Sequence, residues 1–145
     1  MKILITGGLG FIGSNLVDYL INKKNVKKIY IIDNLSKSNL DYLESICNYR
    51  YFNDSKHYRS CSSRIIVINE DICNFKFAVR ITKYVDYIIH LAAESGIDTS
   101  VKNPKKSFDI NVTGTFNYLE AARINKIKKF IFASSGSVFG DIKAP

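Results

Sequence analysis

A cluster of four glycines near the N-terminus constrains this chain more than any other feature. Apolar residues 3–5 lead into Thr6, and glycines follow at positions 7, 8, 10 and 13. The last three fit G-x-G-x-x-G, and the first, third and fourth fit the wider pattern G-x-x-G-x-x-G. A helical pattern begins at once, with one apolar face formed by Leu16, Val17, Leu20 and Ile21. The segment therefore predicts a buried strand, a tight turn and a helix packed closely on that strand.

A second apolar run, residues 29–32, ends in Asp33, 20 residues after Gly13. In a dinucleotide site a carboxylate at this spacing accepts hydrogen bonds from the adenosine ribose, and the helix N-terminus after the glycines holds the pyrophosphate. The alternative is a glycine-rich turn with an unrelated loop-capping aspartate, but the matched spacing favours the dinucleotide. Asp33 would repel a 2′-phosphate and no arginine follows it, so NAD is predicted over NADP. Lys37 is close enough in sequence to approach the ribose.

The bulk composition narrows the class of protein. A length of 145 residues with 46% apolar residues suits one domain, residues 1–145, and no stretch reaches a membrane span of about 20 apolar residues. Because the chain begins directly on a core strand, we expect no leader peptide. Cys47, Cys61 and Cys73 lack metal-site or redox-pair spacing and suggest free thiols in a cytoplasmic protein without a metal. The net charge of +8 comes from scattered lysines without a base-stacking motif, which argues against nucleic acid.

Alternating strand and helix patterns predict an α/β fold, a Rossmann-type doubly wound parallel sheet truncated after about the fifth strand. The expected strands lie near residues 2–6, 28–33, 64–68, 85–92 and 128–134. The expected helices lie near residues 13–24, 39–50, 75–83 and 104–125. The polar, tyrosine-rich and basic stretch 48–64 is predicted to be a solvated surface loop, with a phosphate or partner contact as the alternative.

Further motifs follow the later strands. Asp71-Ile72 follows the third predicted strand, residues 90–95 read His-Leu-Ala-Ala-Glu-Ser, and residues 132–140 read Phe-Ala-Ser-Ser-Gly-Ser-Val-Phe-Gly. A further motif, Asn-Val-Thr-Gly-Thr at residues 111–115, lies inside the long predicted helix. Ligands of open α/β sheets bind outside the carboxyl ends of the strands, so the strand-end motifs are expected to converge on the glycine loop.

Taken together and in this order, the motifs resemble the NAD-dependent epimerase/dehydratase family. These are extended short-chain dehydrogenases that remodel nucleotide sugars, and the chain looks most like UDP-glucose 4-epimerases. The resemblance implies cofactor contacts by Gly7, Gly10, Phe11, Ile12, Gly13, Asp33, Asn34, Ser36, Lys37, Ser38, Asp71, Ile72, Leu91, Ala92, Ala93, Asn111 and Ser134. In that scheme the glycine loop meets the pyrophosphate, residues 33–38 the adenosine ribose, residues 71–72 adenine, and Asn111 the nicotinamide half.

The resemblance also implies catalysis by transient oxidation at C4 of the sugar of a nucleotide-sugar substrate, with Ser135 as the catalytic hydroxyl. The family pairs it with Tyr-x-x-x-Lys, in which a lysine and the nicotinamide charge lower the pKa of the tyrosine. The literal match Tyr19–Lys23 falls in the first helix, away from the expected substrate side, and is rejected. We therefore expect an incomplete NAD-binding domain, without the C-terminal substrate domain, from a longer enzyme. The strand near 128–134 would then be an exposed edge.

Other interpretations stay open for single residues and for the whole chain. Asp71 would also suit a helix cap, Asn111 a polar contact between helix and sheet, and Ser134 and Ser135 partners of loop amides. His90 is interpreted as a core histidine. For the whole chain, the alternatives are a non-catalytic dinucleotide-binding module and, far behind, a Rossmann-type methyltransferase; within the family, dehydratases and reductases stay possible. Homodimers are common in this family, and the helix near 104–125 is one candidate surface.

Overall fold

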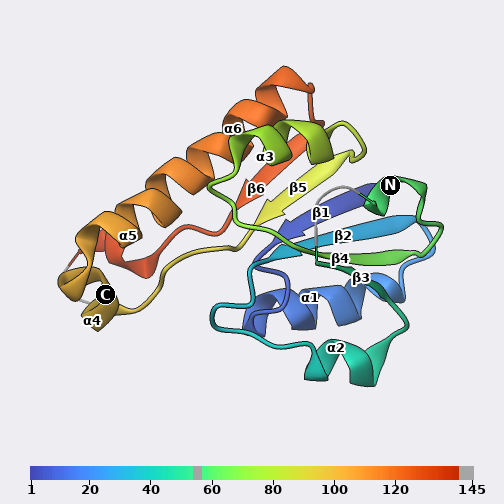
Figure 1. The fold of residues 1–145 in the computed structure, drawn as a ribbon, viewed down its shortest axis with the longest axis horizontal. Coiled ribbons are helices and arrows are strands. Elements are labelled where there is room, and N and C mark those ends of the chain that lie inside the picture. Colours follow the sequence, from blue (N-terminus) through green and yellow to red (C-terminus); the bar gives the residue numbers. More distant parts are fainter. Residues whose placement is uncertain (54–56, 141–145) are drawn as a thin grey trace.

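The computed structural model describes residues 1–53 and 57–140. Six parallel strands form one sheet in the order β3-β4-β2-β1-β5-β6 (Figure 1). Their bounds are β1 Lys2–Thr6, β2 Lys28–Asp33, β3 Arg50–Phe52, β4 Ile65–Asn69, β5 Tyr87–His90 and β6 Lys129–Phe132. The strand order reverses at β1, which pairs with β2 on one side and β5 on the other. This topology confirms the predicted Rossmann-type doubly wound sheet.

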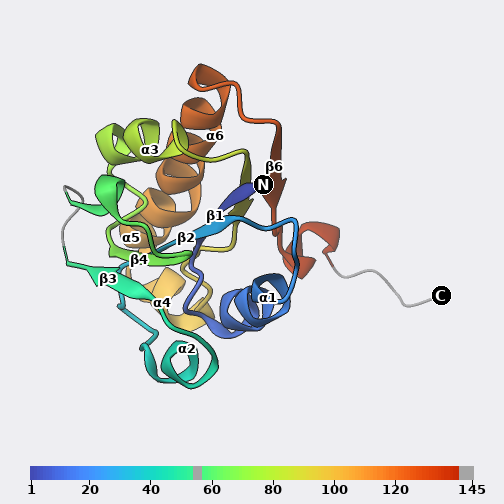
Figure 2. The same cartoon turned by 90° about the vertical axis from the view of Figure 1, so that its right-hand side faces the viewer.

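Helices cover both faces of the sheet (Figures 1 and 2). The bounds of the helices are α1 Phe11–Ile21, α2 Asp41–Ile46, α3 Phe75–Thr82, α4 Ile97–Lys102, α5 Pro104–Phe108 and α6 Thr115–Ile124. Helices α1 and α2 lie on one face of the sheet and α3 and α6 on the opposite face, while α4 and α5 extend beyond the carboxyl ends of the strands. Within the described residues no helix is long and apolar enough to cross a membrane.

Two apolar cores form because successive strand residues point to opposite faces of the sheet. In β1, Leu4 packs into the core beneath α3 and α6, whereas Ile3 and Ile5 pack into the core beneath α1 and α2. Strands β2 and β4 alternate in the same way. Both faces of the sheet are therefore buried under apolar side chains, which explains the nearly continuous apolar sequence of these strands.

The prediction that the stretch 48–64 is a solvated loop is wrong, because part of it forms a strand and one of its side chains is buried. Its residues Arg50–Phe52 form β3, which pairs with β4 and adds a sixth strand to the five that were predicted. Tyr58 is fully buried, and its ring makes edge contacts with Tyr30 and Phe77. A single aromatic anchor within a polar run has no periodicity, so its burial could not be predicted from the pattern.

The long helix predicted over 104–125 is present but not uniform. α5 and α6 are joined by a π-helical segment, Asp109–Gly114, and α4 precedes them without having been predicted. A Cβ on Gly114 would lie 2.5 Å from Cδ1 of Ile72, so this wider turn sits directly against the loop after β4. A single widened turn does not change the apolar periodicity of the sequence enough to be predicted from it. Such π-helical turns are frequent at functional sites.

Candidate cofactor-binding site

The turn after β1 has the shape that its glycines allow. Gly7 has a φ of +66°, and a Cβ there would lie 2.7 Å from the backbone nitrogen of Ala92. A Cβ on Gly13 would lie 2.5 Å from the carbonyl oxygen of Gly7. The loop after β1 therefore packs backbone against backbone, both on the loop after β5 and on the first turn of α1.

The N-terminus of α1 opens toward solvent and is not closed by a side chain. Gly10 is the N-cap and provides no side-chain hydrogen bond, and the first turn contains no acidic residue. Phe11 and Ile12 are exposed. The first N–H groups of a helix lack intrahelical acceptors and carry partial positive charge, so this end can hold an anion.

Asp33 lies at the carboxyl end of β2 with its carboxylate held by three donors. Leu9 N donates to Oδ2 at 3.0 Å, and Oδ1 accepts from Leu35 N at 3.0 Å and from the Ser38 hydroxyl at 2.8 Å. The loop after β2 thus wraps around the carboxylate and fixes its direction. A carboxylate has about four acceptor positions, which leaves capacity for a ligand hydroxyl.

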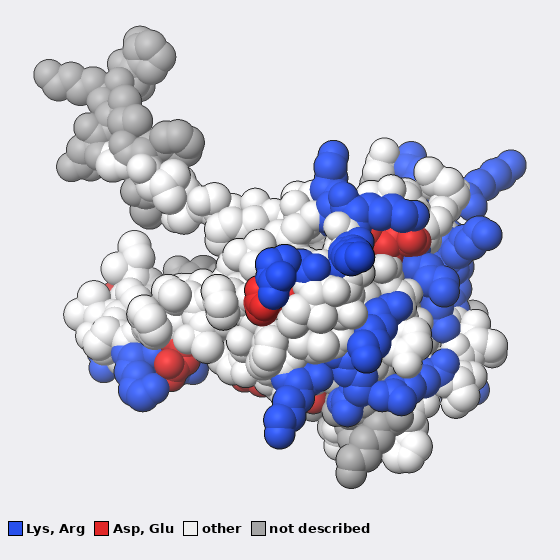
Figure 3. All heavy atoms as spheres, turned by 90° about the horizontal axis from the view of Figure 1, so that it is seen from above, with Lys and Arg blue, Asp and Glu red and all other residues white. Residues whose placement is uncertain are grey.

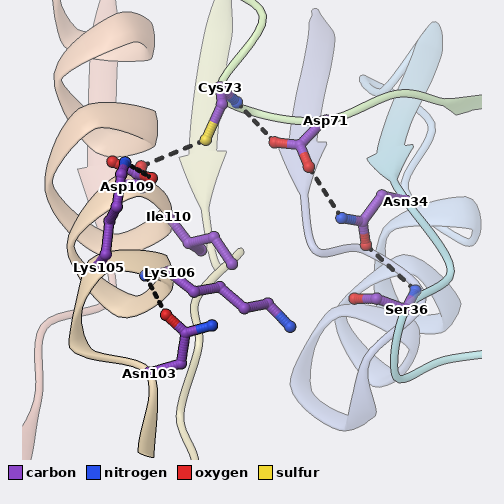
Figure 4. A pocket seen from close by; sticks show the side chains of 9 residues that line it. All are labelled: Asn34, Ser36, Asp71, Cys73, Asn103, Lys105, Lys106, Asp109 and Ile110. Atoms are coloured by element: carbon purple, nitrogen blue, oxygen red, sulfur yellow. Dashed lines mark hydrogen bonds and ion pairs between the residues drawn. The ribbon is translucent and has the colours of Figure 1, made fainter. Parts of the chain in front are cut away.

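Asp71 lies beside Asn34 at the ends of β4 and β2. The Asn34 amide donates to Asp71 Oδ2 at 3.1 Å, while Asp71 Oδ1 accepts from Cys73 N at 2.8 Å (Figure 4). The cap of α3 is Asn74, whose side chain accepts from Phe77 N. The helix-cap alternative for Asp71 is therefore wrong.

His90 belongs to the core, as interpreted from the sequence. It is fully buried, with Nδ1 2.8 Å from the Thr6 hydroxyl and Nε2 3.1 Å from the Thr115 hydroxyl. Burial lowers the pKa of its imidazole to about 4, so it is neutral at pH 7. The Thr6 hydroxyl also accepts a hydrogen bond from Ala92 N, which ties this polar chain to the loop after β5.

Glu94, which follows Ala93, is a buried carboxylate that the sequence did not single out. It forms ion pairs with Lys37 of the loop after β2 and, at 3.7 Å, with Lys106 of α5. The hydrogen bond from Lys37 lowers the pKa of the Glu94 carboxyl, which is therefore ionised at neutral pH. In the sequence, only its position within residues 90–95, at the end of a predicted strand, indicates that it lies near the site.

Asn111 lies in the π-helical segment and binds the backbone of the loop after β5. Its Oδ1 accepts from Glu94 N at 2.8 Å and its Nδ2 donates to Glu94 O at 3.0 Å. In this arrangement its amide holds the loop and matches the alternative of a polar contact between helix and sheet.

These loops enclose a cavity of about 490 Å³ at the carboxyl ends of the strands. Of the predicted residues, it is lined by Gly7, Gly10, Phe11, Ile12, Gly13, Asp33, Asn34, Ser36, Lys37, Ser38, Asp71, Ile72, Leu91, Ala92, Ala93 and Ser134. Asn111 and Ser135 are not in this lining, which is drawn from the described part of the chain. The lining residues that were not predicted are Ile32, Glu70, Glu94, Ser95, Ile110 and Ala133.

A second cavity of about 360 Å³ adjoins the first and shares Asn34, Ser36, Asp71 and Ile110 with it. Figure 4 shows its opposite wall, formed by α5 and the start of the π-helical segment. Cys73 lines this cavity, and burial together with Asp71 raises the pKa of its thiol to about 11. This cysteine is therefore protonated at neutral pH.

The arrangement fits an extended dinucleotide. The larger cavity runs past the ends of β4, β2, β1, β5 and β6, with the open helix N-terminus of α1 near its middle and Asp33 to one side. Its volume lies within the ordinary range of ligand sites, about 300–1,000 Å³. The rejected Tyr19–Lys23 match is elsewhere: Tyr19 is 61% exposed, and its ring packs under the Lys23 ammonium.

Known proteins of similar sequence and fold are consistent with a dinucleotide site. Residues 4–145 match the family model described as GDP-mannose 4,6 dehydratase. CDP-paratose 2-epimerase of Salmonella typhi is 37% identical over 99% of the chain, which spans 39% of that protein.

Two solved structures combine this fold with bound NAD. A dTDP-glucose 4,6-dehydratase of Streptomyces venezuelae with NAD bound superimposes with a TM-score of 0.83 at 27% identity, covering 100% of this chain and 42% of that one. A UDP-glucose-4-epimerase of Stenotrophomonas maltophila with NAD and a formylated UDP-arabinopyranose has a TM-score of 0.80 at 25% identity, covering 99% and 40%.

The chain spans about two fifths of the length of each of these three relatives. The match to the family model extends over nearly the whole chain. The chain therefore belongs to the GDP-mannose 4,6 dehydratase family, among the NAD-dependent epimerases and dehydratases that its motifs resemble.

Proposed function

We propose that this chain binds NAD in the cavity at the carboxyl ends of its strands and forms the cofactor-binding portion of a nucleotide-sugar epimerase or dehydratase. The observation that carries the proposal is the convergence of five strand ends on one cavity, with an uncapped helix N-terminus beside a strand-end carboxylate. The NAD-bound relatives with the same fold support it.

Each wall of the cavity has a task in this proposal. The N-terminus of α1 holds the pyrophosphate, and the remaining acceptor capacity of Asp33 binds the adenosine ribose. Asn34 adds a polar group beside the adenosine ribose, Asp71 and Ile72 contact adenine, and Ala92 and Ala93 leave room for the cofactor to pass close to the backbone. When bound, NAD supplies a hydride acceptor that returns the hydride within the same turnover.

Within this family we propose a 4-epimerase that acts by oxidation at C4 of the sugar. Ser135 would hold the reacting hydroxyl, and the sequence Ser135-Gly136-Ser137 lacks the acidic residues expected beside that hydroxyl in a 4,6-dehydratase. The first check is the intact mass of the native protein from its source. A species well above 16.5 kDa would direct the search for Tyr-x-x-x-Lys to the rest of the protein, with interconversion of UDP-glucose and UDP-galactose as the assay.

A dinucleotide-binding module without turnover is the second candidate. Ser135, the only proposed catalytic side chain in the sequence given, does not line the cavity in the described structure. A native species of 16.5 kDa that binds NAD without converting nucleotide sugars would favour this candidate over the enzyme.

The binding step itself is tested by calorimetry on the 145-residue chain with NAD. We expect Asp33→Ala to weaken the binding of NAD at least about tenfold, because it removes a charged group that would hydrogen-bond the ribose. Asp41→Ala, an acidic residue on α2 outside the cavity lining, is the matched control and should leave the affinity unchanged. Absence of NAD binding by the unaltered chain, or equal affinity after Asp33→Ala, would overturn the proposal.

We also propose that the full protein self-associates through the α5–α6 side of the molecule. Phe108, Val112, Phe116 and Leu119 form an exposed apolar row there, between 46% and 62% accessible. Such a row is typical of a protein–protein contact. Sedimentation velocity on the native protein should show a dimer, and Phe116→Glu should give a monomer; a native monomer at micromolar concentration would contradict this.

A further inference from the structure

Glu94 and two lysines form a charged cluster at the cavity that the proposed NAD-binding scheme leaves unexplained. The Glu94 side chain is 2% exposed, whereas its partners Lys37 and Lys106 are about half exposed. The three residues come from the loop after β2, the loop after β5 and α5. Figure 4 shows Lys106 extending from α5 toward the side of the cavity that holds Asn34 and Ser36.

The carboxylate of Glu94 is held in place by its surroundings. Asn111 binds both the N–H and the carbonyl of the Glu94 backbone, and Gly96 N lies 3.4 Å from Oε1. The lysines, in contrast, are long and flexible and carry compact charges. Glu94 is therefore the fixed member of the cluster, and it decides where the two ammonium groups lie.

Lys37 starts from the ribose end of the cavity. It directly precedes Ser38, whose hydroxyl donates to the Asp33 carboxylate, so the Lys37 backbone lies within one residue of the group expected to meet the ribose. A basic side chain at this end is the usual partner of a 2′-phosphate. In this structure the Lys37 ammonium instead reaches Glu94, beyond the glycine loop.

We propose that Glu94 is a selectivity-determining residue, which holds the Lys37 ammonium away from the adenosine 2′ position and so disfavours a 2′-phosphorylated dinucleotide. The inference rests on the proposed NAD-binding function and adds a second determinant to Asp33. Asp33 repels a 2′-phosphate directly, and Glu94 removes the one lysine on the adjoining loop that could compensate.

The test compares binding of 5′-ADP and 2′,5′-ADP to the 145-residue chain by calorimetry. These probes differ only in the 2′-phosphate and need no turnover. The unaltered chain should prefer 5′-ADP. Glu94→Gln keeps the size of the side chain but removes the charge that holds Lys37. It should shift the ratio of the two affinities toward 2′,5′-ADP by about tenfold, the effect of one added charge-assisted hydrogen bond.

Two further variants separate Lys37 from a general change in charge. Lys37→Met alone should change the ratio much less than Glu94→Gln does, because that ammonium is already engaged by Glu94. The double variant Glu94→Gln/Lys37→Met should have the same ratio as Lys37→Met. Glu120→Gln is the matched control. It also removes a carboxylate from an ion pair, that with Arg123, but on α6 and outside the cavity lining, and should have no effect.

Several outcomes would overturn the inference while leaving NAD binding intact. These are an unchanged ratio in Glu94→Gln, equal tightening of both probes, or a gain that survives Lys37→Met. Failure of the unaltered chain to bind 5′-ADP at all would instead reject the proposed function, and this inference with it. Circular dichroism and thermal unfolding of each variant establish that it is folded.

Discussion

Gly7 combines two constraints that only glycine meets at its position. Its φ of +66° lies in the left-handed region, and a Cβ would fall within 3 Å of the Ala92 backbone. The first constraint is local to the turn, while the second depends on the loop after β5, 85 positions further along the chain. One residue thus couples the shape of the turn to the closure of the cavity.

We expect Gly7→Ala to lower the free energy of unfolding by ~1–3 kcal/mol, because both the backbone and the neighbouring loop must shift. Urea unfolding followed by circular dichroism measures this. Gly136→Ala is the control, since a Cβ there meets nothing within 4 Å. Equal effects of the two substitutions would show that the close approach at Gly7 does not matter.

His90 predicts a pH dependence of stability. Burial lowers the pKa of its imidazole to about 4, against about 6.5 in an unfolded chain, so between these values the unfolded state binds more protons. The contribution of His90 to stability is complete above pH 6.5 and is lost as the pH falls toward 4, a total of about 3 kcal/mol.

Urea unfolding of the protein and of His90→Asn at pH 7.5 and 4.5 isolates this contribution from that of the carboxylates. The unaltered protein should lose about 2–3 kcal/mol more of its free energy of unfolding than the variant over this range. An NMR titration of His90 that gives a pKa near 6.5 would contradict the prediction.

At the scale of elements, α6 and the π-helical segment hold two of the loops that form the cavity. Asn111 binds the backbone of Glu94, and Asn117 donates to the carbonyls of Ile72 and Cys73 at 3.2 and 3.0 Å. Asn125 has a similar role at the other end of α6, where it donates to the Val79 carbonyl and the Thr82 hydroxyl of α3. The helix therefore serves the site at one end and the core at the other.

Asn117→Ala and Asn125→Ala should each cost ~1–3 kcal/mol of stability, since each removes two hydrogen bonds that tie α6 to a neighbouring segment. We expect only Asn117→Ala to weaken binding of 5′-ADP as well, because only Asn117 holds the loop that carries Asp71. Unfolding and calorimetry on both variants compare the two effects. A similar loss of 5′-ADP binding in Asn125→Ala would point to general destabilisation instead.

For the whole molecule, the two edges of the sheet differ in character. In the described chain β6 pairs with β5 alone, and its residues Ile131 and Phe132 are 47% and 53% exposed. An apolar strand with unpaired backbone groups is a template for association, as expected from the sequence for this segment. The opposite edge, β3, has only three residues and begins with Arg50.

Ile131→Lys should therefore raise the concentration at which the 145-residue chain stays free of aggregates, because a lysine on an edge strand opposes pairing. Static light scattering over a concentration series measures this. Tyr51→Lys, which places a lysine on the β3 edge, is the control and should have a smaller effect; the reverse order would show that β6 is not the vulnerable edge.

Features that depend on contacts between residues close in sequence were predicted, whereas features that depend on contacts between distant segments were not. The glycine spacing and the position of Asp33 depend on contacts within one strand–turn–helix unit and its neighbour, and both lie where expected. Tyr58 was missed because its burial depends on Tyr30 and Phe77, which only the folded chain brings near. Glu94 was not predicted to line the cavity, because its ion pairs with Lys37 and Lys106 join it to residues of two other segments that only the folded chain brings near.

By itself the sequence determined the alternation of strands and helices, the parallel sheet and the glycine turn, because each depends on the local spacing of apolar residues or on the backbone preferences of single residues. Tertiary structure alone decided that the stretch 48–64 adds a strand, that Asn111 binds a backbone segment, and that the Lys37 charge is engaged by Glu94. These depend on which distant segments meet at the carboxyl ends of the strands, and the strand order, with β1 between β2 and β5, determines that meeting.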